Sequence, residues 1–172
     1  MPDGGRARDG YLESREMLEL LQNHATGMPV LDAEADFRRA RRAHAVARVS
    51  RWLRRAPDCR HPRTLGDVAV MVGGFPREQV VPLDAIVGTL EPTPHFDARF
   101  RPASEVVRGR WQRIALAHRR GDALPPIDLI KRPDGYYVLD GRHRVSVARA
   151  LGYPDIDARV TGGRATGGRP ER

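Results

Sequence analysis

The spacing of hydrophobic positions predicts helices in the first part of the chain. It indicates a short amphipathic helix over residues 11–24 and a long helix from an N-cap at Asp32 to about Arg55. A further helix is predicted over residues 64–71. In the second half of the long helix one face is apolar, and we expect Trp52 on that face to belong to the core. The residues of this face are Ala45, Val46, Val49, Trp52 and Leu53.

From residue 76 onward, short apolar runs are separated by Pro and Gly, which predicts a mixture of strands and helices. Pro133-Asp134-Gly135 is typical of a hairpin turn, and residues 89–102 are rich in Pro and irregular. The expected strands are residues 79–83, 127–132, 136–139 and 156–160. The expected helices are residues 104–120 and 145–151, which end at Gly121 and Gly152.

These elements divide the chain into four parts. The run Gly73-Gly74-Phe75-Pro76 is interpreted as a linker, which places a domain boundary there. In the last twelve residues five are Gly or Pro, which indicates a flexible tail. The parts are a disordered leader (1–10), a helical, Arg-rich extension (11–75), a mixed domain (76–160) and the tail (161–172).

The most informative stretch is residues 136–144, where an apolar strand runs into a glycine turn and then into a helix. Arg142, His143 and Arg144 stand where that helix begins. The first N–H groups of a helix have no partner within it, so the corner is a candidate anion site. Cations there oppose the helix dipole, and they cost stability unless an anion or a carboxylate such as Asp140 compensates. The simpler interpretation is a turn that needs the positive φ of glycine and carries solvated arginines.

Composition and length indicate one globular domain with extensions. The chain has 172 residues, of which 40% are hydrophobic and 30% charged. It has no apolar run of about 18 residues, and its start lacks the apolar core of a signal peptide. We therefore expect a cytoplasmic protein with no membrane partner. Cys59 is the only cysteine, and only His61 stands close to it as a second zinc-type ligand, so we expect neither an intrachain disulfide nor a metal site.

The net charge of +8 is concentrated in one segment. Residues 36–63 contain ten Arg and two Asp, 10 − 2 = +8, so the remaining 20 basic and 20 acidic residues cancel. Such a segment favours contact with DNA or RNA phosphates. Other interpretations are a solvated helix face and a face that pairs with acidic residues of a partner chain; a homodimer is expected to use the N-terminal helices. The expected nucleic-acid contacts are Arg41, Arg48, Arg51 and Arg55.

The order of the elements after residue 76 resembles the ParB/sulfiredoxin fold. The residues that carry the resemblance are the turn Asp140-Gly141-Arg142-His143-Arg144 before an Ala-rich helix, the Val-Pro-Leu-Asp-Ala-Ile run at 81–86, and the Leu-Pro-Pro-Ile run at 124–127. The similarity covers residues 80–160, about half of the chain. It implies an α+β fold with a small mixed sheet and packed helices, here preceded by an N-terminal helical extension.

The branches of this superfamily imply different chemistries at the turn. In sulfiredoxins the turn carries the catalytic cysteine, which Arg142 replaces here. In ParB-type partition proteins a similar turn holds the phosphates of CTP, and Gly141 and Arg144 match that turn. Those proteins also carry a helix-turn-helix domain after the shared fold. A complete partition protein is not expected here. In free-serine kinases the turn reads Asp-Gly-His-x-Arg, its Asp is implicated in phosphoryl transfer, and Asp140 matches that residue. The candidates by position for the catalytic Glu of that branch are Glu91 and Glu105.

Two functional hypotheses follow. The first is a ParB-like nucleic-acid-associated protein in which Gly141, Arg142, His143 and Arg144 bind a nucleotide or another phosphate. The alternative is a nucleotide-dependent small-molecule kinase or nucleotide hydrolase that uses a nucleoside triphosphate with Mg²⁺ and Asp140 as its catalytic carboxylate. The simpler role for Asp140 is that of a turn residue paired with Arg144. A third option is an assembly protein whose N-terminal helices bind a partner.

Overall fold

The computed structural model of the chain describes residues 26–54, 61–65 and 70–165. This part has the predicted α+β class, and none of its helices is long and apolar enough to cross a membrane. The strands are β1 (Arg63–Thr64), β2 (Val70–Pro82), β3 (Ile86–Thr89), β4 (Ile127–Arg132), β5 (Gly135–Asp140) and β6 (Asp155–Ala165). The helices are α2 (Pro29–Leu53), α3 (Arg108–Arg120) and α4 (Arg142–Ala150), with short 3₁₀ turns η1 (Leu83–Ala85) and η2 (Glu105–Val107).

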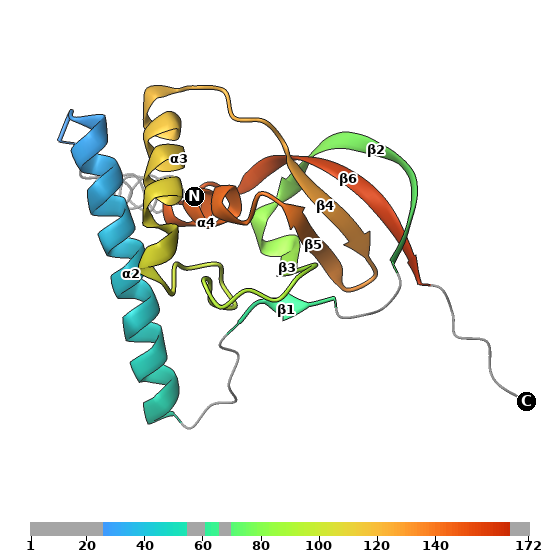
Figure 1. Ribbon diagram of the computed structural model, residues 1–172, viewed down its shortest axis with the longest axis horizontal. Helices are drawn as coiled ribbons and strands as arrows, with labels where there is room; N and C mark the ends of the chain where they lie inside the picture. The colour runs from blue at the N-terminus through green and yellow to red at the C-terminus, as the bar shows by residue number, and fades with distance from the viewer. Residues whose placement is uncertain (1–25, 55–60, 66–69, 166–172) are drawn as a thin grey trace, which may run out of the picture.

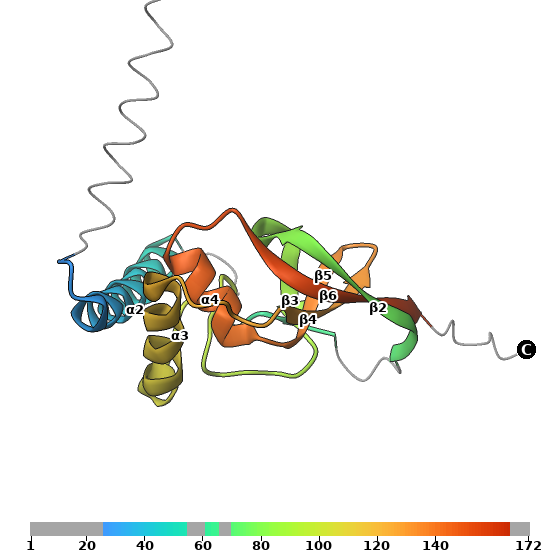
Figure 2. The same cartoon turned by 90° about the horizontal axis from the view of Figure 1, so that it is seen from above.

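The described strands form one mixed sheet with the order β1-β3-β5-β4-β6-β2. β4 and β5 are the predicted antiparallel hairpin, whereas β4 and β6 run parallel. β2 lies at one edge and pairs antiparallel with β6, from Val70 opposite Ala165 to Pro82 opposite Asp155. Figure 1 shows β2 and β6 as a long curved pair at the end of the molecule away from α2. The three helices gather at the other end (Figures 1 and 2).

α4 stands between two hydrophobic cores. Its Val145 and Ala148 belong to the core against the sheet, whereas its Val147 belongs to the core shared with α2 and α3. The fully buried Trp111 of α3 also reaches α4, because its Nε1 donates to Ser146 Oγ at 2.9 Å. The sheet-side core consists of Val81, Leu83, Ile86, Phe100, Ile127, Leu129, Val138, Val145, Ala148, Ala158 and Val160. The helix-side core consists of Ala33, Phe37, Ala40, Phe96, Val107, Trp111, Ala115 and Val147.

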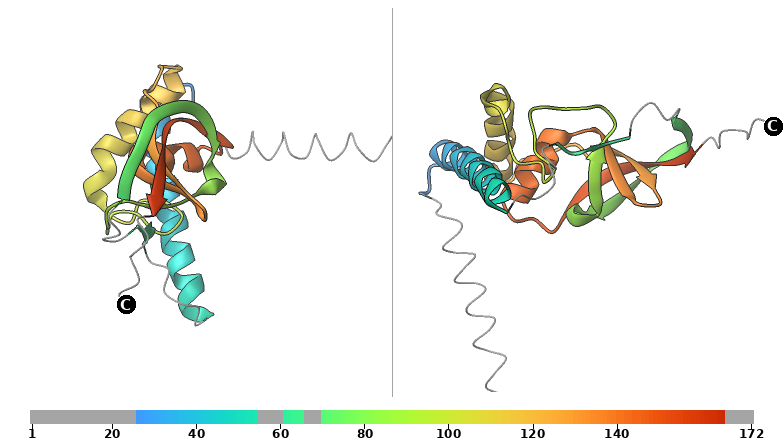
Figure 3. Two further views of the ribbon diagram at one scale, coloured as in Figure 1. Left: turned by 90° about the vertical axis from the view of Figure 1, so that its right-hand side faces the viewer. Right: turned by 90° about the horizontal axis from the view of Figure 1, so that it is seen from below.

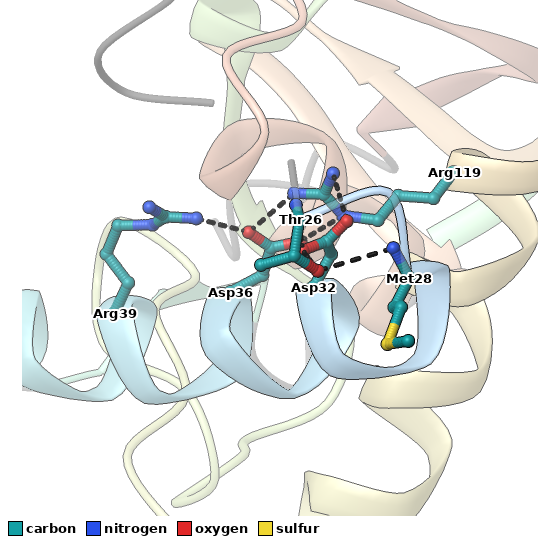
Figure 4. A network of polar contacts seen from close by, with 6 residues as sticks. All are labelled: Thr26, Met28, Asp32, Asp36, Arg39 and Arg119. Carbon is teal, nitrogen blue, oxygen red and sulfur yellow. Dashed lines mark hydrogen bonds and ion pairs between the residues drawn. The ribbon is translucent and has the colours of Figure 1, made fainter. Parts of the chain in front are cut away.

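A polar network fixes the start of α2 against the end of α3 (Figure 4). The buried carboxylate of Asp36 accepts two bonds from Arg119, at 2.7 Å from Nε and 2.9 Å from Nη2. The backbone N–H and hydroxyl of Thr26 both donate to Asp32 at 2.8 Å, and the N–H bond holds the pKa of Asp32 below its ordinary value. The N-cap is Met28 and not Asp32, because the helix already starts at Pro29, whose missing N–H suits the first helical position.

The helix predicted over residues 64–71 is wrong where the structure describes it, because Thr64 belongs to β1 and β2 starts at Val70. The Gly73-Gly74 run is no linker either. The register of β2 against β6 shifts between Gly73 and Arg77, so these glycines lie at a bulge inside a strand. The boundary expected at residue 76 therefore falls within β2, and β6 continues past residue 160 to Ala165. The leader, the helix over 11–24 and Arg55 lie outside the described residues.

The expectation that Trp52 belongs to the core is also wrong, since Trp52 is 78% exposed. In the first half of α2 the buried positions Ala33, Phe37 and Ala40 follow helical spacing toward α3. Val46 and its apolar neighbours lie on the opposite side of the helix, so the two halves of α2 have apolar faces that point in opposite directions. Figures 1 and 3 show the C-terminal part of α2 extending beyond α3 and α4. The exposed residues of this face are Val46, Val49, Trp52 and Leu53.

Candidate functional site

The predicted corner between β5 and α4 is built on Gly141. Its φ is +103°, in the left-handed region that favours glycine, and a Cβ at this position would collide with the side chain of Ile127. The first hydrogen bond of α4 runs from the N–H of Val145 to Gly141 O at 3.0 Å, and no side chain caps the helix. The N–H groups of the first three helical residues therefore precede the hydrogen-bond ladder and face outward.

Arg144 holds this corner together. Its Nη1 donates to the carbonyl oxygens of Pro125 and Pro126, the latter at 2.8 Å, and its Nη2 donates to Asp140 Oδ2 at 2.7 Å. The Arg144 side chain is 12% exposed and the Asp140 side chain 58% exposed. Arg144 thus ties the start of α4 to the segment before β4 through Nη1 and to the end of β5 through Nη2. A phosphate contact of Arg144 stays a prediction, and the pairing with Asp140 agrees with the structural role considered for that carboxylate.

His143 lies in a strongly electropositive environment. Its ring is half-buried and packs edge to face against Phe96, with 5.1 Å between the ring centroids. Burial lowers the pKa of His143 to about 4, and the nearby positive charges of Arg110, Arg142 and His95 add to that effect. His143 is therefore neutral at pH 7. Three other basic side chains therefore lie near His143: Arg110 from α3, Arg142 from α4 and His95 from the loop before Phe96.

We call this arrangement the α4 N-terminal site: His95, Arg110, Arg142, His143 and the open N–H groups of α4. The sequence pattern identified Arg142 and His143 at the helix start but not Arg110 or His95. No local pattern indicates Arg110. The only signal was its position beside Trp111, which the apolar spacing of α3 places in the core.

Two acidic residues lie near this site: Asp140, whose charge acts on His143, and Glu91. Glu91 Oε2 lies 3.7 Å from Arg142 Nη2. Glu105, the other candidate by position, instead pairs with Arg41 Nε at 3.2 Å and with Arg108 at 3.8 Å, beside α2. Among the described residues no group of three His, Cys, Asp or Glu side chains is arranged to hold a metal ion.

The predicted nucleic-acid contacts lie elsewhere, on α2. Arg41 and Arg48 line an open groove of about 480 Å³ between α2 and the start of α3. Arg51 does not line it, and Arg55 is outside the described residues. His44 also lines this arginine groove, and its Nδ1 lies 3.1 Å from the fully buried carboxylate of Asp97. The basic residues of the groove are Arg38, Arg41, Arg42, His44, Arg48 and Arg108.

Comparisons with known proteins yield one structural neighbour. No family model matches the chain, and no curated protein matches it. Among solved structures, it is similar to a sulfiredoxin from Arabidopsis thaliana, with 24% sequence identity and a TM-score of 0.39. The match covers 51% of this chain and 88% of the sulfiredoxin. At that level of similarity no residue of the site is carried over.

Proposed function

We propose that the chain is a ParB-like, nucleic-acid-associated protein that binds a phosphorylated ligand, in the first place a nucleotide, at the α4 N-terminal site. The observation that carries this proposal is the crowding of His95, Arg110 and Arg142 around His143 at an open helix N-terminus. The positive charges of Arg110 and Arg142 both act on His143, so they repel one another, and a bound phosphate relieves that repulsion. The resemblance of residues 140–144 to the ParB/sulfiredoxin turn supports the same conclusion.

The side chains of the site have distinct roles in this proposal. Arg110 and Arg142 pair with phosphate oxygens, and the N–H groups at the start of α4 donate to the same phosphate. His143 is neutral and donates one hydrogen bond, with its ring held against Phe96. Gly141 and Arg144 keep the turn in shape. Because Arg110, Arg142 and the uncapped start of α4 all lie near His143, we expect the ligand to carry two or more negative charges.

A thermal-shift panel tests this binding. Saturation at about one hundred times Kd stabilises the protein by about 2.7 kcal/mol, which for a chain of 172 residues raises Tm by roughly 5–11 °C. We expect that shift with at least one of CTP, ATP and GTP, and its loss in Arg142→Ala and Arg110→Ala. Arg113→Ala is the matched control, because Arg113 is exposed one turn further along α3. A shift that all three variants retain would refute the assignment, as would no shift with any of the nucleotides.

The kinase or hydrolase alternative rests on the position of two carboxylates. Asp140 is more than half exposed, and Glu91 lies 3.7 Å from Arg142, so both carboxylates are near the proposed phosphate site. In this alternative Asp140 orients or deprotonates the acceptor, and a nucleoside triphosphate with Mg²⁺ is the phosphoryl donor. The test is nucleotide turnover with Mg²⁺. Turnover that Asp140→Asn abolishes while its Tm stays near that of the wild type supports the enzyme; turnover unchanged in Asp140→Asn, or none at all, contradicts it.

Association with nucleic acid is proposed for the arginine groove on α2. The groove has five arginines, and of its lining residues only Glu105 is acidic. Removing a side chain that pairs with one DNA phosphate lowers the slope of log K against log salt by about one. We expect duplex DNA to bind with a clear salt dependence in fluorescence anisotropy, and Arg41→Ala and Arg48→Ala each to reduce that slope. Arg159→Ala on β6 is the control. The absence of binding at low salt, or binding with no salt dependence, rejects the nucleic-acid role.

A further inference from the structure

A second cavity lies at the other end of α4. It has a volume of about 640 Å³, opens to solvent, and is lined by residues of α2, η1, the start of β3, the loop at residues 98–102 and the C-terminal half of α4. Half of its lining residues are apolar and mostly small, with Ala40, Ala43, Ile86 and Pro102 among them. We call it the α4 C-terminal cavity. Its charged lining residues are Arg39, Asp84, Arg99, Arg101 and Arg149.

Arg149 is a partly buried cation with no carboxylate at ion-pair distance among the described residues, although the charges of Asp84 and Asp97 act on it from further away. Its Nη2 donates to the carbonyl oxygens of Leu83 at 2.6 Å and Ile86 at 2.9 Å, and its guanidinium lies over the Phe100 ring at 5.1 Å from the centroid. Within the described residues, its buried Nε has no hydrogen-bond partner and no carboxylate lies within 4 Å. Burial lowers the pKa of Arg149, so keeping this charge in place costs free energy. Buried charges in proteins are normally paired, so the exposed end of the cavity beside this guanidinium favours an acidic group.

The other arginines of the cavity add positive charge, and two of them are paired with carboxylates that are not among the lining residues. Arg101 is tied to Asp97 by an Nε–Oδ2 bond of 2.8 Å, and Arg39 reaches Asp36. Neither carboxylate is among the lining residues, and each also contacts a second basic residue: Asp97 contacts His44, and Asp36 contacts Arg119. The lining residues alone have a charge of 4 − 1 = +3, counting four arginines and Asp84. Arg99 has an exposed side chain at the rim, and its backbone N–H donates to Asp97.

We propose that the α4 C-terminal cavity binds a small organic anion that carries at least one carboxylate or phosphate group on a short apolar body. The arginines hold the acidic group, and the alanine-lined wall holds the body. The volume is in the range of small-molecule pockets and is far larger than a bare inorganic anion fills. This proposal does not rest on the nucleotide site, since the two sites share no residue.

Isothermal titration of the full chain at low salt tests the proposal, since weak charge pairs are screened as salt rises. The probes are succinate, which has two carboxylates, and 3-phosphoglycerate, which has a carboxylate and a phosphate. Succinamide, of the same shape and no charge, is the control. We expect saturable binding of one or both anions below about 10 mM, the range of weak but specific ligands, and no binding of succinamide. Which of the two anions binds more tightly tells a carboxylate site from a phosphate site.

Variants and amide shifts locate the binding. Arg99→Ala leaves the backbone bond to Asp97 in place, so the fold is kept. Because the variant loses one positive charge of the cavity, the affinity for the anion falls at least about tenfold. Arg99→Lys restores the charge and recovers part of that affinity. The amide resonances of Ala40, Ala43 and Ala98 shift on titration. The proposal is overturned by no saturable binding of either anion, by equal affinity in Arg99→Ala, or by binding that Arg142→Ala removes and Arg99→Ala does not. That last result would place the anion at the α4 N-terminal site instead.

Discussion

Replacing Gly141 by alanine tests the construction of the corner between β5 and α4. The left-handed φ of +103° costs a non-glycine residue about 1–2 kcal/mol. The added Cβ would also collide with Ile127, which is fully buried and has no free space to move into, and overpacking of this kind costs about 1–3 kcal/mol. The sum is a loss of about 3 kcal/mol in the free energy of unfolding, or a fall in Tm of about 6–12 °C for a chain of this length.

Gly152→Ala is the matched control for that prediction. Gly152 ends α4 with a φ of +80°, and nothing lies within 4 Å of the position a Cβ would take. The control therefore has the backbone strain alone, about 1 kcal/mol. Both variants are measured by urea denaturation and by differential scanning calorimetry. If Gly141→Ala loses no more stability than Gly152→Ala, the contact with Ile127 does not constrain the corner, and the reasoning is refuted.

Three further predictions concern the same elements. Asp36→Asn removes the carboxylate that accepts two bonds from the nearly buried Arg119 and leaves only the longer contact to Asp32 at 3.8 Å. It lowers the free energy of unfolding by about 3 kcal/mol in urea denaturation, whereas an exposed pair such as Arg38–Glu34 contributes under about 1 kcal/mol. Trp111→Phe removes the Nε1 bond to Ser146. In a double-mutant cycle with Ser146→Ala we expect a coupling energy of about 1 kcal/mol. A coupling energy of zero would show that this hydrogen bond does not stabilise the protein. Because the pKa of His143 in the folded chain is about 4 against an ordinary 6.5, the unfolded chain binds more protons between these values. Stability is therefore complete above about pH 6.5 and falls as the pH drops toward 4, and the slope flattens in His143→Gln.

Elements whose pattern is local could be predicted from the sequence. The β4–β5 hairpin follows from two apolar runs around Pro133-Asp134-Gly135, and the end of α3 follows from Gly121, whose φ is +74°. The start of β2 could not be found in this way. Its residues, from Val70 opposite Ala165 to Gly73 opposite Gly162, pair with β6 between 89 and 95 positions further along the chain, and its two glycines have the same sequence pattern as a linker.

The candidate site also contains a local part, which the sequence predicts, and a part that only tertiary packing brings together. The glycine, the helix start and the Asp140–Arg144 pair are neighbours in sequence, and the structure brings them together as expected. Arg110 and Glu91 reach the same corner only through the packing of α3 on α4 and the course of the chain after β3. The prediction that Trp52 is buried was wrong for a related reason. Helical spacing identifies an apolar face of α2 but not the direction in which the rest of the protein lies.

The place of α4 between two cores has a consequence for hydrogen exchange. Opening the middle of this nine-residue helix requires the sheet-side and helix-side cores to part together, so the amide hydrogens of Val147 and Ala148 exchange only through events close to global unfolding. The amides of Arg142, His143 and Arg144, which precede the first hydrogen bond of α4, exchange rapidly in the native state. One short helix thus combines the most protected amides of the domain with N–H groups that are open to solvent and to a ligand.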